Sequence, residues 1–264
     1  MKILDGRELA GFIKERQAHQ VRALPTKPKL LIIRDSDDPV IMKYVNLKIK
    51  YGTDIGIEVE DYLASNPEAI ATKIKSANAD PLVSGIIIQL PIKDKSQTDT
   101  LCDLIAPGKD VDGLGSHAKY DSATATAINW LLTSYSIDLQ SSRIAIIGRG
   151  KLVGAPLYKM FTASGYTVDL FHRGSDLTKL KQYDIIITAT GTPGLISDSM
   201  VSPGTCLVDA GTASENGVLK GDLSASVHTR TDLTAITPRT GGVGPLTISV
   251  LFDHVIRSSS NSRA

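Results

Sequence analysis

The stretch Arg143–Ala163, which reads RIAIIGRGKLVGAPLYKMFTA, decides the fold of this chain. An apolar run of strand length leads into a turn that holds Gly148, Gly150 and Gly154, and a segment of helical periodicity follows. This order is typical of a Rossmann unit, because glycine permits the tight bend and lets the backbone approach a pyrophosphate. The N-terminus of the helix then stabilises the phosphate charge. The spacing is one residue longer than the common G-x-G-x-x-G, so the prediction of a dinucleotide site depends on the flanking strand and helix.

The next expected strand, TVDLFH, bears on the choice of nucleotide. An NAD-binding protein usually carries an acidic residue at the end of this strand, where it bonds the ribose 2′-hydroxyl. Here the strand ends in His172 and Arg173, and Arg149 projects from the glycine turn. Cationic groups at this place favour a 2′-phosphate, so the sequence predicts NADP rather than NAD. The alternative is that these arginines only face solvent, as most single arginines do.

Two later apolar runs, ITATGTPG and VDAGT, end in small residues. The carboxyl ends of parallel strands form the edge at which a dinucleotide binds, and small side chains there leave room for nicotinamide. Ordinary turns have a similar composition, so these runs only support the prediction. The expected cofactor-binding residues are Gly148, Arg149, Gly150, Val153, Gly154, His172, Arg173, Thr190, Gly191, Thr192, Pro193, Ala210, Gly211 and Thr212.

Strand-length apolar runs alternate with helical segments along the rest of the chain. The expected strands are 30–33, 57–62, 85–90, 143–148, 167–172, 184–190 and 206–211, and the expected helices are 40–52, 67–78, 123–136, 153–164 and 246–256. Continuous β-branched runs suit strands that are buried on both faces of a parallel sheet. The pattern predicts an α/β protein of two domains, an N-terminal α/β domain and a Rossmann-type, doubly wound parallel sheet.

Two places in the sequence suggest domain boundaries. One lies near Ala123, ahead of the helix that leads into the RIAIIG strand, and the other lies in the glycine-rich stretch Gly241–Pro245. We therefore expect residues 1–123 to form the first domain and residues 124–244 the second. The C-terminal helix, within 245–264, is expected to return to the first domain.

Composition argues against several classes of protein. The chain has 264 residues, with 29 Lys and Arg against 28 Asp and Glu, so no strong net field attracts nucleic acid or a membrane surface. It shows neither a secretory signal nor a run near the roughly 18 apolar residues of a membrane span. Cys102 and Cys206 lie in apolar segments, which favours buried thiols in a reducing compartment. The missing signal and the buried thiols together predict a cytoplasmic protein. The histidines show no metal-ligand spacing, so we expect no metal site.

Three fragments of the first half carry polar side chains in suggestive places. Tyr44 and Lys48 of YVNLKIK are four residues apart and so share one face of the expected helix. Taken alone, such a pair is normally a solvated face with an extended lysine. Gln89 ends the buried run GIIIQL just before Pro91, and Asp112 lies in the turn GKDVDG.

With these fragments and the glycine turn, the sequence resembles the bifunctional methylenetetrahydrofolate dehydrogenase/cyclohydrolase family. The matching motifs, in that family's order, are YVNLKIK, NADPLVSGIIIQLPI, KDVDG, GRGKLVGAP and TPRTGGVGPLT. The resemblance implies NADP-dependent oxidation of 5,10-methylenetetrahydrofolate to the 5,10-methenyl form, and hydrolysis of that form to 10-formyltetrahydrofolate. It also implies a homodimer in one-carbon metabolism that supplies purine biosynthesis, with a folate-binding catalytic first domain.

The resemblance assigns roles to individual residues. Lys48 matches the catalytic lysine, Tyr44 a tyrosine that lines the folate pocket, and Gln89 the glutamine that contacts the lysine. Asp112 matches the aspartate that holds the pterin. The lysine has an ordinary pKa of about 10.4, so burial or nearby positive charge must lower it before the amine can take up a proton. The expected catalytic residues are Lys48, Tyr44, Gln89 and Asp112, and the expected substrate-binding residues are Tyr44, Gln89, Leu90, Pro91, Asp112, Gly241, Gly242, Gly244 and Pro245.

The chain departs from the family pattern in several places. Ile41 stands where serine is usual, Gly150 also replaces a common serine, and the PCTP stretch reads SATA. The segment 113–124 is several residues shorter than usual and borders the expected folate pocket. Arg239 and Thr240 replace an apolar residue and a proline before GGVGP, which is expected to loosen that loop.

Two other functions stay open from the sequence. A shikimate-type NADP dehydrogenase also has a small α/β domain followed by a Rossmann domain, but it would require neither QLP nor DVDG. A folate- or nucleotide-binding homologue with weakened catalysis would account for the shortened segment and the altered PCTP stretch.

Overall fold

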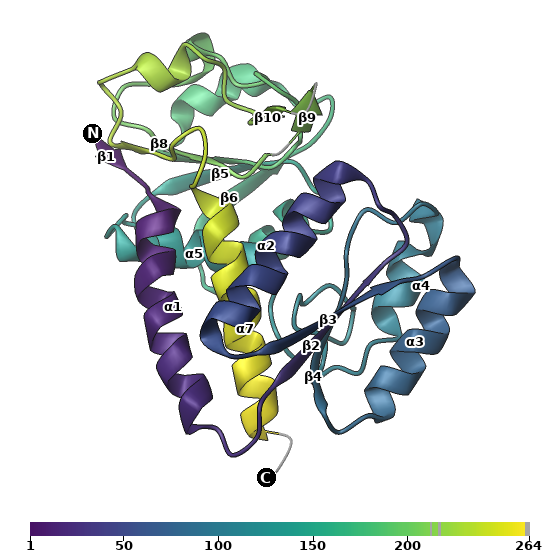
Figure 1. Cartoon of the computed structure of the whole chain (residues 1–264). Coiled ribbons are helices and arrows are strands. Elements are labelled where there is room, and N and C mark those ends of the chain that lie inside the picture. Colours follow the sequence, from purple (N-terminus) through teal and green to yellow (C-terminus); the bar gives the residue numbers. More distant parts are fainter. Residues whose placement is uncertain (212, 216–217, 262–264) are drawn as a thin grey trace. The chain divides into compact units, whose positions relative to one another are not determined.

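The chain folds into two units, each built from two segments of sequence. The computed structural model describes residues 1–211, 213–215 and 218–261, and Thr212, expected at the nucleotide site, lies outside them. One unit contains Met1–Ala10 and Thr124–Thr247, and the other contains Gly11–Ala123 and Ile248–Ala264. We name them the six-stranded unit and the three-stranded unit after their parallel sheets (Figure 1).

The six-stranded unit has the all-parallel sheet expected of a Rossmann fold. Its strand order is β1-β11-β8-β7-β5-β6, and every neighbouring pair is parallel. The strands are β1 (Lys2–Ile3), β11 (Ala235–Ile236), β8 (Cys206–Asp209), β7 (Ile185–Thr188), β5 (Arg143–Ile147) and β6 (Thr167–Phe171). β7 is buried throughout, whereas β6 lies at the sheet edge and alternates between exposed and partly buried residues. The expectation of burial on both faces is therefore wrong for this edge strand.

The helices of this part of the chain are short. They are α5 (Ala123–Ser134), α6 (Gly154–Ala163) and 3₁₀ turns at Leu177–Gln182, Asp198–Met200 and Val227–Thr229. β9 (Ala213–Glu215) and β10 (Val218–Lys220) form a separate antiparallel pair. Phe171, Leu180 and Tyr183 pack with residues of β5, β7 and β8 in one core cluster.

The three-stranded unit is built on a second parallel sheet in the order β3-β2-β4. Its strands are β2 (Lys29–Arg34), β3 (Glu58–Leu63) and β4 (Val83–Ile88). Its own helices are α2 (Pro39–Ile55), α3 (Pro67–Ala79), a 3₁₀ turn at Lys95–Gln97 and α4 (Thr98–Asp103). Most of α1 (Gly6–Ala23) and of α7 (Val243–Asn261) also belongs to this unit. α3 and α4 cover one face of this sheet (Figure 1), where Ile70, Ile74 and Leu101 pack on Leu31 and Ile86. β3, an edge strand, is only partly buried, so burial on both faces is again not found.

On α2, the residue Gly52 allows close packing in this unit. A Cβ atom there would lie 2.4 Å from Val59 Cγ2 and 3.1 Å from the ring of Phe252. α2 can therefore lie close to both β3 and the C-terminal helix, which no larger residue would permit.

All the expected strands and helices are present, with bounds shifted by a few residues, and the α/β fold class is confirmed. The long helix α1 was not anticipated. Its buried positions follow helical spacing, but they include Gly6, Ala10 and Gln17, so little apolar periodicity is visible in the sequence. Within the residues that the structure describes, none of the helices has the length and apolar character that crossing a bilayer requires.

Candidate active site

Lys48 lies on the buried side of α2. The helix begins after Asp38, whose carboxylate accepts the Val40 and Ile41 N–H groups, with Pro39 as the first helical residue. Its buried stripe runs through Ile41, Val45, Gly52 and Ile55.

Positions 45, 48 and 52 fall on this same stripe of α2 at helical spacing. Lys48 is therefore partly buried, on the side of α2 that faces the interior of this unit. Tyr44 precedes Lys48 by one turn and is partly buried. Because both residues are in α2, four positions apart, Tyr44 and Lys48 share one face of the helix, as predicted.

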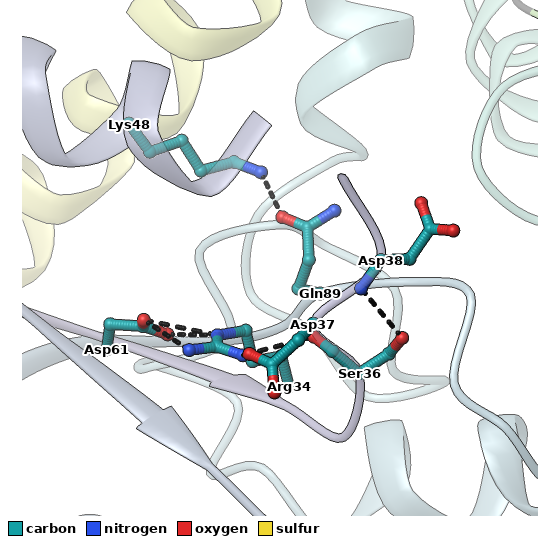
Figure 2. Close-up of polar contacts among 7 residues, drawn as sticks. All are labelled: Arg34, Ser36, Asp37, Asp38, Lys48, Asp61 and Gln89. Atoms are coloured by element: carbon teal, nitrogen blue, oxygen red, sulfur yellow. Dashed lines mark hydrogen bonds and ion pairs between the residues drawn. The ribbon is translucent and has the colours of Figure 1, made fainter. Parts of the chain in front are cut away.

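Gln89 meets Lys48 directly. The Lys48 amine donates a hydrogen bond to Gln89 Oε1 at 2.6 Å (Figure 2). Gln89 follows the last residue of β4, and its N–H donates to the Ile33 carbonyl of β2 at 2.7 Å, which fixes its backbone. The amide is therefore presented from the end of a buried sheet. Leu90 is half-buried, and Pro91, joined to it by a cis peptide, is exposed.

The turn that carries Asp112 is attached to the same strand. The Ile86 N–H of β4 donates to the Lys109 carbonyl at 2.8 Å. Asp110 is 2 % exposed, and its carboxylate accepts the N–H groups of Gly113, Leu114 and Gly115 at 3.0, 3.1 and 2.7 Å. Asp110 thus shapes the turn. Sequence analysis missed it, although an aspartate three residues before a glycine is a signal for such a turn.

Burial changes the acid–base properties of this site. Desolvation lowers the pKa of Lys48, and the negative charge of Asp112 opposes that change. The pKa of Asp112 is raised to about 6, first by burial, with the positive charge of Lys48 opposing the shift and Asp110 adding to it. The expectation that Lys48 needs a lowered pKa agrees with this environment. Burial is the main cause of the shift.

The shortened segment 113–124 closes back on the Asp112 turn. The Ala123 N–H donates to the Asp112 carbonyl at 3.0 Å. The Tyr120 ring stacks on His254 of α7 with 4.6 Å between centroids, and a ring nitrogen of His254 lies 2.9 Å from the Val111 carbonyl. The short segment is therefore packed against the turn, and a longer loop is not needed to hold it.

In the six-stranded unit, the glycine turn has the close packing expected of a dinucleotide site. Gly148 has φ 104°, and a Cβ atom there would lie 2.5 Å from the Ala189 carbonyl oxygen. A Cβ at Gly154 would lie 1.8 Å from the Gly148 carbonyl oxygen, so only glycine lets α6 begin this close to the turn. Gly150 has open space around it, and Val153 directly precedes α6.

The cationic residues expected near the ribose flank this turn. The Gly148 N–H donates to the Phe171 carbonyl at 2.9 Å, which joins the turn to the end of β6. Arg149, His172 and Arg173, which lie on these two connected segments, are all exposed. They are therefore accessible to an anionic group.

The other expected cofactor residues follow the carboxyl ends of β7 and β8. Thr190 and Pro193 are partly buried, and Gly191 and Thr192 are exposed. Ala210 is partly buried, and Gly211 is buried. The buried carboxylate of Asp222 contacts this region, and sequence analysis did not single it out.

The glycine-rich segment Gly241–Pro245, whose last three residues begin α7, is held by the first residues of the chain. The Gly6 N–H donates to the Gly241 carbonyl at 2.9 Å, and a Cβ at Gly6 would lie 1.8 Å from the Gly242 carbonyl oxygen. Arg7 Nη2 donates to Thr240 Oγ1 at 2.9 Å. Thr240, which replaces the usual proline, is thus tied to α1. Gly244, in the first turn of α7, is exposed.

The structure also bears on metals and thiols. Cys102 and Cys206 are both buried, as predicted. Across the described ranges 1–211, 213–215 and 218–261, no three His, Cys, Asp or Glu side chains gather in a way that could hold a metal ion.

A Rossmann sheet with a glycine turn, and a second α/β unit that presents a partly buried lysine, define a nucleotide-binding enzyme of two units. Family models match both parts: residues 4–112 match the tetrahydrofolate dehydrogenase/cyclohydrolase catalytic domain, and residues 122–263 match its NAD(P)-binding domain. The chain belongs to the tetrahydrofolate dehydrogenase/cyclohydrolase family.

Individual relatives are similar over nearly their whole length. The chain is 34% identical to the bifunctional protein FolD of Hydrogenobaculum sp. (strain Y04AAS1), with 98% of each chain covered. The crystal structure of the bifunctional enzyme FolD, a methylenetetrahydrofolate dehydrogenase/cyclohydrolase, from Campylobacter jejuni superposes with a TM-score of 0.90 at 30% identity, covering 99% of each chain. The corresponding enzyme from Thermoplasma acidophilum gives a TM-score of 0.88 at 28% identity, again with 99% of each chain covered.

Proposed function

We propose that the chain oxidises 5,10-methylenetetrahydrofolate with NADP⁺ and hydrolyses the methenyl product to 10-formyltetrahydrofolate. The hydrogen bond between Lys48 and Gln89, in a buried site influenced by Asp112, is the observation that carries this proposal. A shikimate-type dehydrogenase would not require these residues. A weakened homologue is also disfavoured, because every side chain assigned to the chemistry is present and the short segment packs against the Asp112 turn.

The three-stranded unit supplies the proposed folate site. Asp112 accepts hydrogen bonds from the amino and ring N–H groups of the pterin, and Tyr44 lines the same pocket. The remaining proposed contacts come from Gln89, Leu90 and Pro91. The sequence-based boundaries of the folate domain, 1–123 with 245–264, stay a prediction.

Lys48 carries the proton transfers of the hydrolytic step. Water adds to the methenyl carbon, and the neutral Lys48 amine takes up the proton that the attacking water loses. The proton then passes to the ring nitrogen as the carbon–nitrogen bond opens. Burial lowers the pKa of Lys48, which raises the fraction of the amine that is neutral near pH 7. Gln89 Oε1 orients the amine.

The six-stranded unit fits a dinucleotide, because glycine at 148 and 154 lets the turn pack closely against the segment after β7 and the start of α6. When bound, NADP⁺ takes up the hydride that the folate methylene carbon gives up. Arg149 and Arg173, with His172, would hold the 2′-phosphate, and the loop at Gly241–Pro245 would border the nicotinamide. The rate of this step depends mainly on how the residues orient the two ligands.

An absorbance assay tests the proposal. Purified protein is mixed with 5,10-methylenetetrahydrofolate and either NADP⁺ or NAD⁺, and the methenyl absorbance band is followed. We expect turnover with NADP⁺ well above that with NAD⁺. Absence of turnover with both nucleotides would contradict the dehydrogenase assignment. Separate assay of methenyl hydrolysis, which needs no nucleotide, tests the second activity.

We also infer that the protein is a homodimer in the cytoplasm, in one-carbon metabolism that supplies purine biosynthesis. The family resemblance supports this, and the near-zero net charge gives no reason to expect nucleic acid as a partner. Sedimentation analysis of the purified chain tests the homodimer, and a monomer at micromolar concentration would contradict it.

A further inference from the structure

We infer that Asp222, supported by Asp209, is a positioning residue that holds the loop after β7 in the shape needed to bind the nucleotide. The inference rests on the proposed NADP site and extends it to two carboxylates that were assigned no role there, Asp222, which is buried, and Asp209, which is partly buried. Neither needs to touch the nucleotide, because each acts through backbone groups and neighbouring side chains.

The side chain of Asp222 is fully buried and accepts three hydrogen bonds from one short stretch of chain. Its Oδ2 accepts from Thr188 Oγ1 and from the Thr190 N–H, each at 2.7 Å. Its Oδ1 accepts from the Thr192 N–H at 2.8 Å. Thr190 and Thr192 are both proposed nucleotide contacts. Asp222 therefore fixes the backbone on which those contacts depend.

Asp209 at the end of β8 holds Asp222 in place. Its Oδ1 accepts from the N–H groups of Gly211 and Asp222 at 3.0 and 3.1 Å, and its Oδ2 accepts from the Leu223 N–H at 3.0 Å. Burial is the main cause that raises the pKa of Asp209 to about 6. A carboxylate buried at this cost is retained where its hydrogen bonds are needed.

Two glycines make this arrangement possible. A Cβ at Gly211 would lie 2.2 Å from Asp222 Oδ1, and a Cβ at Gly221 would lie 2.1 Å from Asp209 Oδ2. Any side chain at either position would push a carboxylate away from its donors. The two aspartates therefore explain why glycine is required at positions 211 and 221.

The loop held by Asp222 also contacts the glycine turn. The Ala189 carbonyl oxygen would be 2.5 Å from a Cβ at Gly148, and Thr190 Cγ2 would be 3.4 Å away. If the loop moved, the backbone at Gly148 would lose the neighbour against which it is packed. A change at Asp222 should thus weaken the pyrophosphate site as well as the contacts at Thr190 and Thr192.

Asp209 also connects this network to the second expected ligand loop. Its N–H donates to Thr237 Oγ1 at 2.9 Å, and Thr237 is fully buried. A Cβ at Gly242 would lie 3.0 Å from Thr237 Cβ, so the threonine packs directly under the glycine-rich loop. Asp209 is therefore connected to both segments proposed to border the nicotinamide: its carboxylate holds Asp222 beneath the loop after β7, and its backbone N–H holds Thr237 beneath the glycine-rich segment.

Asp222→Asn is the most informative variant, because it keeps the size of the side chain. An amide has one acceptor oxygen, so its NH₂ group must face at least one of the N–H donors at Thr190 and Thr192. We expect the dissociation constant for NADP⁺ to rise at least about tenfold, as for loss of a hydrogen bond to a charged group. The KM for folate should change less than about twofold, since hydrogen bonds of the folate site are untouched.

An assay of the hydrolytic step distinguishes a positioning role of Asp222 from a general role in the stability of the fold. Methenyl hydrolysis uses no nucleotide, so Asp222→Asn should retain it while dehydrogenase turnover at low NADP⁺ falls. Asp232→Asn, which removes an exposed ion pair with Arg230 in the same unit, is the matched control and should bind NADP⁺ as the unaltered protein does.

Unchanged NADP⁺ affinity in Asp222→Asn would overturn the inference, and so would an equal loss of both activities. If that variant does not fold, Thr188→Val removes one donor to Asp222 and should weaken NADP⁺ binding about two- to fivefold in the same direction; no change there would also overturn it. Failure of the unaltered protein to bind NADP⁺ would instead contradict the proposed function itself.

Discussion

Lys48 and Gln89 lie 41 residues apart in the sequence, and their side chains meet in a hydrogen bond of 2.6 Å between Nζ and Oε1. The lysine comes from the buried stripe of a helix and the glutamine from the end of a buried strand. Neither backbone can shift easily, so the amine is held at one place. An amine held in this way, with a pKa lowered by burial, suits proton transfer near neutral pH.

Replacing Lys48 by methionine should abolish methenyl hydrolysis. The variant keeps the apolar stem and loses the amine, so the rate should fall at least about a hundredfold, the contribution typical of a general base. Nucleotide binding should be retained, because the residues proposed to bind NADP lie in the other unit. Hydrolysis rates and NADP⁺ dissociation constants of both proteins provide the measurement. Hydrolysis at the unaltered rate would remove Lys48 from the mechanism.

Gln89→Glu should shift the pH dependence of hydrolysis to higher pH. A carboxylate in place of the amide stabilises the charged ammonium of Lys48 and raises its pKa, so less neutral amine is present at a given pH. The rate at pH 7 should fall roughly tenfold or more and recover as pH increases. Gln89→Leu is the control, because it removes the hydrogen bond without adding charge. If the hydrolysis rates of the two variants depended on pH in the same way, that result would argue against the proposed role of Gln89.

The free energy of unfolding should depend on pH in a way that reflects the raised pKa of Asp112. This pKa is about 6 in the folded chain against 3.8 as the ordinary value, so the folded state binds the proton more tightly than the unfolded state. The contribution is therefore present at low pH and is lost as pH rises from about 4 through about 6.

Asp112→Asn provides the test of that contribution. The free energy of unfolding of the unaltered protein, relative to the variant, should fall by about 2 kcal/mol between pH 4 and pH 7. Denaturant unfolding at several pH values measures this difference. A constant difference over that range would mean that the carboxylate titrates at its ordinary pKa. The variant should also have weakened folate binding at pH 7.

The double variant Arg149→Ala with Arg173→Ala should discriminate between nucleotides. The two exposed guanidinium groups are proposed to bind the 2′-phosphate, so NADP⁺ affinity should fall about ten- to a hundredfold. NAD⁺ lacks that phosphate, and its affinity should change less than about threefold. Calorimetric titration with each nucleotide gives both values. Equal losses would show that the arginines do not distinguish them.

Much of the fold was predictable because its strands are continuous apolar runs and its helices have clear periodicity. RIAIIG forms β5, and the glycine turn after it packs as a Rossmann turn should. α1 was missed because three of its five buried residues are small or polar, and one of these, Gln17, donates to the Ser249 carbonyl at 2.8 Å. β1 and β11 have two residues each, too few to show a period.

The candidate site was only partly accessible from sequence. Lys48, Gln89 and Asp112 were singled out through a family resemblance, since nothing in local spacing brings distant segments together. Asp110 and Asp222 act mainly through backbone N–H groups, which nearly every residue carries, so a single sequence does not show which segments they hold. The spacing of Asp110 and Gly113 indicates a turn but no role in a site, and Asp222 beside Gly221 has the composition of an ordinary turn.

The pairing of β1 with β11 has a consequence for how the protein is made. Lys2 and Ile3 align with Ala235 and Ile236, so this edge of the sheet joins two segments that are very far apart in the sequence. Residues 1–10 cannot dock on β11 until residues 235–236 have been synthesised, and they must remain undocked until then. Completion of this nucleotide-binding half is thus governed by contacts of very long sequence separation.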